Sequence, residues 1–387
     1  MSRVALALLA ALAFCGVGAS GADFSASSAS PTTITAAADF NTVAVTLGTV
    51  NPALSGTVAL TATATSNRGI ASVAFQYSVA GAGNWVEICS DATASYGCSW
   101  NTAALADGSY DVRALATDTA GYTRTDTRAG RTVDNTAPSA TPSTPTTGSG
   151  TVTMTVSVSD SGSGIAYVKW EALYQGTWYE FCRDTAAPYE CSGNSAQVPD
   201  GTYSIRVTTV DNAGMAFTSP QSSITIDNTR PAGSSISTTG AGAGVAGRLD
   251  QDDVIQLTWS EPIAPASVLT GWNGSNQPIR VRVREAAGND QMDFLTTGGI
   301  RLNLVLGPAD LTLGGNYVTA DTDFDATMTQ SGATITITLG TQLPGGAVVT
   351  AAAGTLSWKP STAAKDIAGN ASTSVTVNEG GTADVDF

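Results

Sequence analysis

The chain has 387 residues, of which 42% are hydrophobic and 13% are charged, and its formal net charge is −15. This length accommodates two to four domains, and the apolar content is too high for a disordered tail. The negative charge argues against binding to nucleic acid or to an anionic membrane, because both need a basic surface. The sequence contains no histidine, which removes the commonest general base and the commonest zinc ligand.

Residues 1–22 have the pattern of a signal peptide, in which Arg3 precedes an apolar run and small residues follow it. The run is too short to span a bilayer comfortably and no stop-transfer pattern follows, so we expect no transmembrane segment after cleavage. Cys15 raises lipid anchoring as an alternative, but Phe14 stands where a lipobox needs a small residue. Residues 23–38 are interpreted as a leader. The sequence therefore predicts export from the cytoplasm.

Two segments of the chain, residues 89–121 and 182–214, match each other without a gap. The offset between them is 93 residues (182 minus 89). The matched pairs include Cys89 and Cys182, Cys98 and Cys191, Tyr110 and Tyr203, and Asp118 and Asp211. So many matches in constant register indicate a duplicated structural unit.

Within each repeat, short segments rich in Thr and Val are separated by Gly-containing turns. In residues 56–65 the apolar and polar side chains alternate, which is the period of a half-buried strand. About seven such strands in roughly 95 residues is the size of an immunoglobulin-like sandwich. The sequence predicts an all-β chain with repeats at residues 39–138 and 139–231.

Several short motifs occur once in each repeat. They are RGIASV (68–73) and SGIAYV (163–168), DTAG and DNAG, and the closing DNTAP (134–138) and DNTRP (227–231). On these motifs the chain resembles bacterial Ig-like domains that occur in tandem on secreted and surface proteins. The resemblance covers most of residues 40–231 and implies an extracellular protein, either secreted or at the cell surface. The Cys…Trp…Cys framework of antibody domains is missing.

Residues 232–387 are predicted to form a larger, divergent Ig-like β-sandwich module. A strand ending in Ser260-Glu261-Pro262 is followed late in the chain by the motif at 366–370, Asp-Ile-Ala-Gly-Asn. This order resembles another class of bacterial Ig-like module. The segment is long for one sandwich, so inserted hairpins or a jelly-roll-like form remain alternatives.

Four cysteines remain after removal of the predicted signal peptide, as two C-x8-C pairs at matching places in the repeats. In an exported chain this pattern predicts local disulfides, Cys89–Cys98 and Cys182–Cys191. The spacing is wrong for zinc. Each bridge would stabilise its repeat by roughly 2–3 kcal/mol by constraining the unfolded chain.

The acidic residues of the DNTAP and DNTRP motifs have two interpretations. The favoured one is that their side chains cap a turn. The other is calcium binding at a junction, in which Asp118 or Asp211 folds back to help. The denser groups at 250–253 and 321–325 are interpreted as solvated loop carboxylates. No metal ligand, no cofactor-binding residue and no catalytic residue is predicted.

Two features of residues 232–387 suggest a binding surface. Arg280, Arg282 and Arg284 share one face of a predicted strand, and they either form a docking stripe or pair with nearby acidic loops. Trp272, in a GWNGSN context, is the tryptophan best placed for exposed ligand contact, whereas core positions are expected for the others.

The sequence thus predicts a non-catalytic structural or spacer protein that presents a C-terminal module. The alternative is adhesion, with residues 232–387 binding a surface protein or a glycan. An enzyme such as a glycosidase would need two carboxyl groups about 5–9.5 Å apart in a cleft, and we do not expect one.

Overall fold

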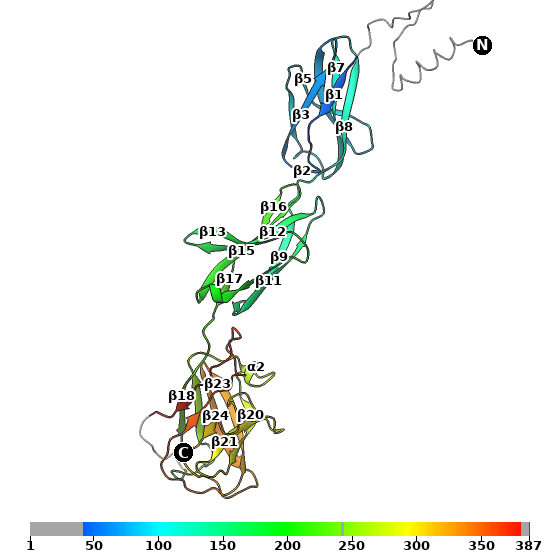
Figure 1. Ribbon diagram of the computed structural model, residues 1–387. Helices are drawn as coiled ribbons and strands as arrows, with labels where there is room; N and C mark the ends of the chain where they lie inside the picture. The colour runs from blue at the N-terminus through cyan, green and yellow to red at the C-terminus, as the bar shows by residue number, and fades with distance from the viewer. Residues whose placement is uncertain (1–41, 241–243, 381–386) are drawn as a thin grey trace, which may run out of the picture. The chain divides into compact units, whose positions relative to one another are not determined.

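The computed structural model describes residues 42–240, 244–380 and 387. The predicted signal peptide and leader, including Cys15, lie outside the described residues. Among these residues nearly all regular structure is β-strand, and the short helices are η1 (Ser195–Gln197) and α2 (Pro265–Val268). The predicted all-β class is therefore confirmed (Figure 1). Among the described residues, no helix has the length and apolar character needed to cross a membrane.

The chain divides into two compact units. The first contains the described residues up to Ala140 together with Val158–Val168 and Thr208–Thr218. The second contains Thr141–Ser157, Lys169–Val207 and Ser219–Phe387. The predicted domain boundaries remain predictions, and the sheets are described below in chain order.

The first repeat is built from a three-stranded and a five-stranded sheet. The former has the order β1 (Ala44–Leu47), β3 (Thr57–Thr65), β6 (Tyr96–Asn101). The latter has the order β2 (Ala53–Leu54), β8 (Thr123–Val133), β7 (Gly108–Asp118), β4 (Ile70–Val79), β5 (Val86–Asp91). Side chains from both sheets form one core, which includes Leu47, Leu60, Phe75, Trp100 and Val112. Strand β3 buries Leu60 and Ala62 and exposes the threonines between, as the alternation predicts.

The second repeat follows the same plan. One sheet has the order β14 (Glu190–Asn194), β11 (Thr151–Ser159), β9 (Ser139–Ser143). The other has the order β10 (Thr147–Gly148), β17 (Ser222–Ile226), β15 (Gly201–Asp211), β12 (Ile165–Tyr174), β13 (Thr177–Asp184), with β16 (Ala216–Thr218) paired to β15. Both repeats contain a tyrosine corner, in which Tyr110 donates to Ala106 O and Tyr203 donates to Pro199 O at 2.9 and 2.8 Å. This bond is a hallmark of Ig-like sandwiches.

The C-terminal part contains a single nine-stranded sheet. Its order is β18 (Gly233–Thr239), β19 (Val254–Trp259), β24 (Thr334–Gln342), β23 (Thr322–Ser331), β20 (Gln277–Arg284), β21 (Gln291–Leu295), β22 (Leu311–Thr312), β25 (Ser357–Trp358), β26 (Val377–Asn378). The sheet is barrel-like, because its first and last strands approach each other. A Cβ atom on Gly233 in β18 would collide with Val377 of β26 and with Pro360. Where the sequence predicted a larger Ig-like β-sandwich, the structure therefore has one curved sheet, which encloses its own core.

Tryptophans fill the centre of this barrel-like sheet. Trp259 and Trp358 meet edge to face with their ring centroids 4.7 Å apart. Trp272 is also buried, with 4% of its surface exposed, and its Nε1 donates to Ser275 O at 2.6 Å. The prediction that Trp272 is exposed for ligand contact is therefore wrong. The glycine-rich loop folds back over the ring, and a backbone carbonyl satisfies the indole N–H.

Candidate functional site

The cysteines lie where each repeat connects its two sheets. Cys89 on β5 is bonded to Cys98 on β6, and Cys182 on β13 is bonded to Cys191 on β14, with Cα–Cα distances of 6.2 and 6.1 Å. An aspartate holds the loop that each bridge closes. Asp91 accepts hydrogen bonds from Thr93 N and Gly97 N. These N–H groups hold the pKa of Asp91 below its usual value.

The equivalent aspartate in the second repeat makes the same arrangement. Asp184 accepts hydrogen bonds from Ala186 N and Glu190 N at 3.1 and 3.0 Å. These bonds lower the pKa of Asp184, the Glu190 N–H most strongly. The Cys–Asp–Cys segments are therefore structural hairpins, and their polar groups are occupied in holding the turn.

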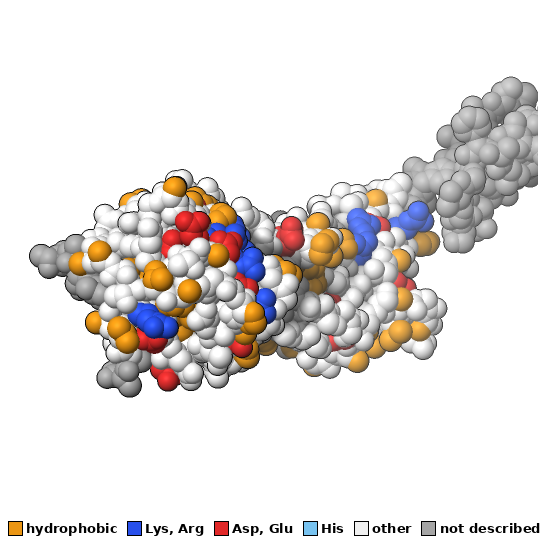
Figure 2. Space-filling view, turned by 90° about the horizontal axis from the view of Figure 1, so that it is seen from below, with side chains coloured by type: hydrophobic (Ala, Val, Ile, Leu, Met, Phe, Trp, Pro, Cys, Tyr) orange, Lys and Arg blue, Asp and Glu red, His pale blue; other side chains and the backbone are white. Residues whose placement is uncertain are grey.

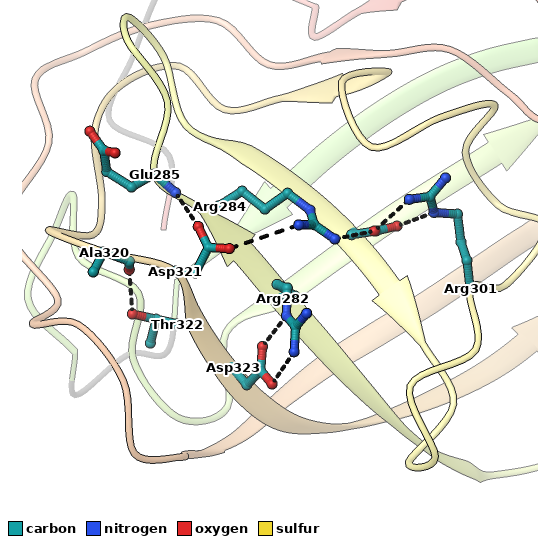
Figure 3. A network of polar contacts seen from close by, with 9 residues as sticks. Arg282, Arg284, Glu285, Arg301, Ala320, Asp321, Thr322 and Asp323 are labelled. Atoms are coloured by element: carbon teal, nitrogen blue, oxygen red, sulfur yellow. Dashed lines mark hydrogen bonds and ion pairs between the residues drawn. The ribbon is translucent and has the colours of Figure 1, made fainter.

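The arginine stripe of β20 is paired with aspartates (Figure 3). Arg282 donates two hydrogen bonds to Asp323 on the neighbouring β23, at 2.7 and 2.9 Å. Arg280 also lies 3.6 Å from Asp323. Arg282 in turn lowers the pKa of Asp323. This arrangement matches the pairing alternative for the stripe.

A buried aspartate completes the network. Asp293 on β21 has no exposed surface and receives two hydrogen bonds from Arg301 and one from Arg284, at 2.8 to 3.1 Å. Arg284 also approaches Asp321 at 3.8 Å. On the face that Figure 2 shows, basic side chains accordingly lie beside acidic ones. The arginines therefore form ion pairs between strands of the sheet, and they do not form a row of unpaired charges.

The acidic group at 250–253 is used locally. Asp253 is buried and accepts a hydrogen bond from Asp250 N at 2.7 Å. Asp250 accepts from Val245 N and forms an ion pair with Arg248 at 3.6 Å. These carboxylates shape the turn before β19.

The Asp-Asn-Thr motifs divide their side chains between two tasks. In the first motif, Asn135 accepts from Gly56 N and donates to Thr102 O, and Thr136 donates to Asp107. These bonds tie the motif to the repeat that precedes it. Asp134 caps the turn of the motif by accepting from Thr136 N at 3.2 Å, and its other oxygen accepts from Ser163 N at 2.7 Å, in the loop after β11. The aspartate of the motif therefore faces the next loops along the chain.

Asp134 joins a cluster of three carboxylates. The others are Asp160, directly after β11, and Asp211, the last residue of β15. One carboxylate oxygen from each residue lies within 4.8 Å of the others. Asp134 and Asp211 are buried, and all three belong to the first unit. Burial and the nearby charges of Asp134 and Asp160 raise the pKa of Asp211, against the backbone N–H groups of Met215 and Ala213.

A second cluster lies in the second unit and comes from equivalent elements. It contains Asp227 of the second Asp-Asn-Thr motif, Glu261 after β19, and Asp366 of the Asp-Ile-Ala-Gly turn, again with oxygens within 4.8 Å. Burial raises the pKa of Glu261 to about 7, and the charges of Asp227 and Asp366 add to the shift.

The first repeat has the same turn without a second carboxylate from the loop after its β3. Asp118, the equivalent of Asp211, accepts from Ala120 N and Tyr122 N. Its other oxygen accepts from the hydroxyl of Ser66 at 3.2 Å. A hydroxyl that donates a hydrogen bond thus stands where the later clusters place a second acidic group.

The calcium alternative drawn from the sequence combined the motif aspartates with Asp118 or Asp211. The structure places Asp211 beside Asp134, the aspartate of the first motif. Asp160 and Glu261 were not named in that alternative. The signal was an acidic residue at the end of the strand that precedes each loop, followed by Gly-rich Ser-Gly-Ser-Gly in one case and by Pro in the other.

The fold and these repeated features define a tandem Ig-like β-sandwich protein with a barrel-like C-terminal part. Residues 42–114 and 132–207 match the family described as bacterial Ig domain. These two segments belong to that family, so the chain carries two bacterial Ig domains in tandem. Together with the two disulfides they indicate an extracytoplasmic protein. No curated protein matches the sequence.

Similar solved structures include the fibronectin(III)-like modules of Clostridium thermocellum CbhA, with 23% identity and a TM-score of 0.33 over 48% of this chain and 94% of that chain. A marsupial T cell receptor matches with 9% identity and a TM-score of 0.19 over 88% and 99%. Escherichia coli alpha-2-macroglobulin matches with 11% identity and a TM-score of 0.20 over 78% and 31%.

Proposed function

We propose that the protein is a non-catalytic structural spacer, secreted or held at the cell surface, whose bacterial Ig domains carry and present the C-terminal barrel-like part. The observation that carries the proposal is that the same three internal ties hold both domains. The disulfide hairpin, the tyrosine corner and the Asp-Asn-Thr tie occur in both domains at an offset of 93 residues. Such duplication is typical of units that are stacked for length.

A spacer is tested by exchanging a domain for another of the same size. Deletion of residues 139–231 should reduce antibody access to a tag placed after residue 387 on intact producing cells. An unrelated Ig domain of similar length, inserted in place of residues 139–231, should restore that access. If the unrelated domain fails to restore it although the chain is exported and folded, the second domain has a sequence-specific role and the spacer proposal is wrong.

The second candidate is adhesion or carbohydrate binding through residues 232–387. The side chains that the sequence suggested for binding are not available to a ligand, since Trp272 is buried and Arg282 is paired with Asp323. The observation in its favour is that large apolar side chains remain exposed there, including Ile300, Ile367 and Val375 at 72%, 69% and 68%. Saturable binding of the full chain on a glycan array, lost in an Ile367→Ser variant, would favour this candidate over the spacer.

A further inference from the structure

The cluster of Asp134, Asp160 and Asp211 places three acidic groups together with no cation from the protein. None of the three forms an ion pair with Lys or Arg within the part of the chain that the structure describes. Burying like charges together is unfavourable unless something compensates them. The arginine network of the C-terminal part shows the usual compensation, in which Asp293 is neutralised by Arg284 and Arg301.

Two carboxylate oxygens of the cluster also accept no hydrogen bond from the described residues. Asp211 is 2% exposed, and its Oδ1 accepts from Ala213 N and Met215 N at 2.8 Å. Its Oδ2 is buried and has no hydrogen-bond partner among the described residues. Oδ1 of Asp160 is likewise buried and without a hydrogen-bond partner among the described residues. A buried carboxylate oxygen without a donor is costly, so these atoms are positioned for a ligand that supplies positive charge.

The spacing of the oxygens suits one ion. Calcium binds carboxylate oxygens at 2.3–2.6 Å, so two ligand atoms on opposite sides of it are roughly 4.6–5.2 Å apart. The oxygens of the cluster all lie within 4.8 Å of one another.

The loop after β11 is built for close approach to the cluster. Asp160 accepts hydrogen bonds from Gly162 N and Gly164 N, and Ser163 N donates to Asp134. Gly162 is so near Asp134 that a Cβ atom would overlap the carboxylate. The loop therefore packs directly against the carboxylates of Asp134 and Asp160.

We propose that Asp134, Asp160 and Asp211 bind one calcium ion. The ion ties the segment that leaves the first bacterial Ig domain to the loop after β11 and to the turn after β15, all within the first unit. The second cluster, with Asp227, Glu261 and Asp366, repeats this composition and supports the inference. The inference goes beyond the spacer proposal, which stands without it.

Calorimetric titration of the full chain with calcium chloride, after treatment with chelator, tests the site. We expect saturable binding, together with a rise in melting temperature that sodium chloride of equal ionic strength does not reproduce. Asp211→Asn keeps the acceptor for Ala213 N and Met215 N, and it should remove one binding event or weaken it at least tenfold. Asp160→Asn should have the same effect.

The chain provides a matched control. Asp118→Asn makes the same change in the equivalent turn of the first repeat, where Ser66 is the partner, and should leave calcium binding unchanged. Glu261→Gln should leave the event assigned to the first cluster intact. Circular dichroism confirms that each variant is folded. An absence of calcium binding to the folded chain, or equal binding by wild type and the Asp211→Asn and Asp160→Asn variants, would overturn the proposal.

Discussion

Glu171 and Arg206 form an ion pair at 3.1 Å in the second repeat, at the place where Gln76 accepts a hydrogen bond from Arg113 at 2.7 Å in the first. Each arginine also lies over a tryptophan ring, Trp178 or Trp85, at 4.3 and 4.0 Å from the ring centre. The two domains therefore keep the stacked arginine and change the charge of its acceptor. The position of each arginine is set by the tryptophan ring and by one acceptor oxygen, and that acceptor need not be a carboxylate.

This relationship predicts that Glu171→Gln is tolerated and Glu171→Ala is not. The amide preserves an acceptor for Arg206, as Gln76 does for Arg113, whereas alanine leaves Arg206 and Lys169 without their buried partner. Calorimetric unfolding should show that Glu171→Ala lowers stability by about 2 kcal/mol more than Glu171→Gln. Equal losses would mean that the carboxylate charge, which both variants lack, is what stabilises this arginine, and would contradict the prediction.

The two tyrosine corners predict that removal of the hydroxyl destabilises the first repeat more than the second. Tyr110 is buried, whereas Tyr203 is half-buried, so the hydrogen bond from Tyr110 to Ala106 O is better shielded from water than the bond from Tyr203 to Pro199 O. Tyr110→Phe should cost about 1 kcal/mol, and Tyr203→Phe less. Chemical denaturation of both variants measures the difference, and a larger loss for Tyr203→Phe contradicts the argument from burial.

Gly162 offers a test of the close approach to Asp134. Gly162→Ala places a methyl group on the carboxylate, so the loop or Asp134 must move, at a cost of about 1–3 kcal/mol. Gly193 in β14 is the control, because a Cβ there meets no atom within 4 Å. Gly193→Ala should be neutral or slightly stabilising in the same thermal scan. Similar melting temperatures for both variants would show that the loop is not confined as described.

Local patterns in the sequence predicted much of this fold. Alternation placed Leu60 in the core, and the burial of Ile279, Val281 and Val283 follows the same rule on β20. The partners of the arginines on the opposite face were harder to predict. Asp293 and Arg301 lie on other segments, and their contact with Arg284 depends on the order of strands in the sheet.

The carboxylate clusters show the same limit. Asp134, Asp160 and Asp211 are far apart in sequence, and only the tertiary fold brings their oxygens together. The repeat offset pointed to Asp134 and Asp211, since both lie in duplicated motifs. It did not point to Asp160, because the first repeat has no acidic residue at the matching position. The prediction that Trp272 is exposed was wrong for a related reason. Its glycine-rich context indicates a loop but does not show that the loop covers the ring.

The pKa of Glu261 predicts an unusual pH dependence for the C-terminal part in the presence of chelator. Burial, Asp227 and Asp366 raise this pKa from 4.5 to about 7 in the folded chain. Between these values the folded state binds more protons than the unfolded state, so the free energy of unfolding falls as pH rises through this window. The melting temperature of this part should therefore be higher at pH 5.5 than at pH 7.5.

A matched variant separates this effect from other titrations. Glu261→Gln removes the titrating group and should flatten the dependence between pH 5.5 and 7.5. Asp323 has the opposite sign, because Arg282 lowers its pKa, but its contribution is lost only as pH falls below about 4. Differential scanning calorimetry across pH 5.5–7.5 measures the melting temperatures of the wild type and of Glu261→Gln. A wild-type melting temperature that rises with pH, or that matches Glu261→Gln at every pH, would contradict the assignment of a buried, proton-binding Glu261.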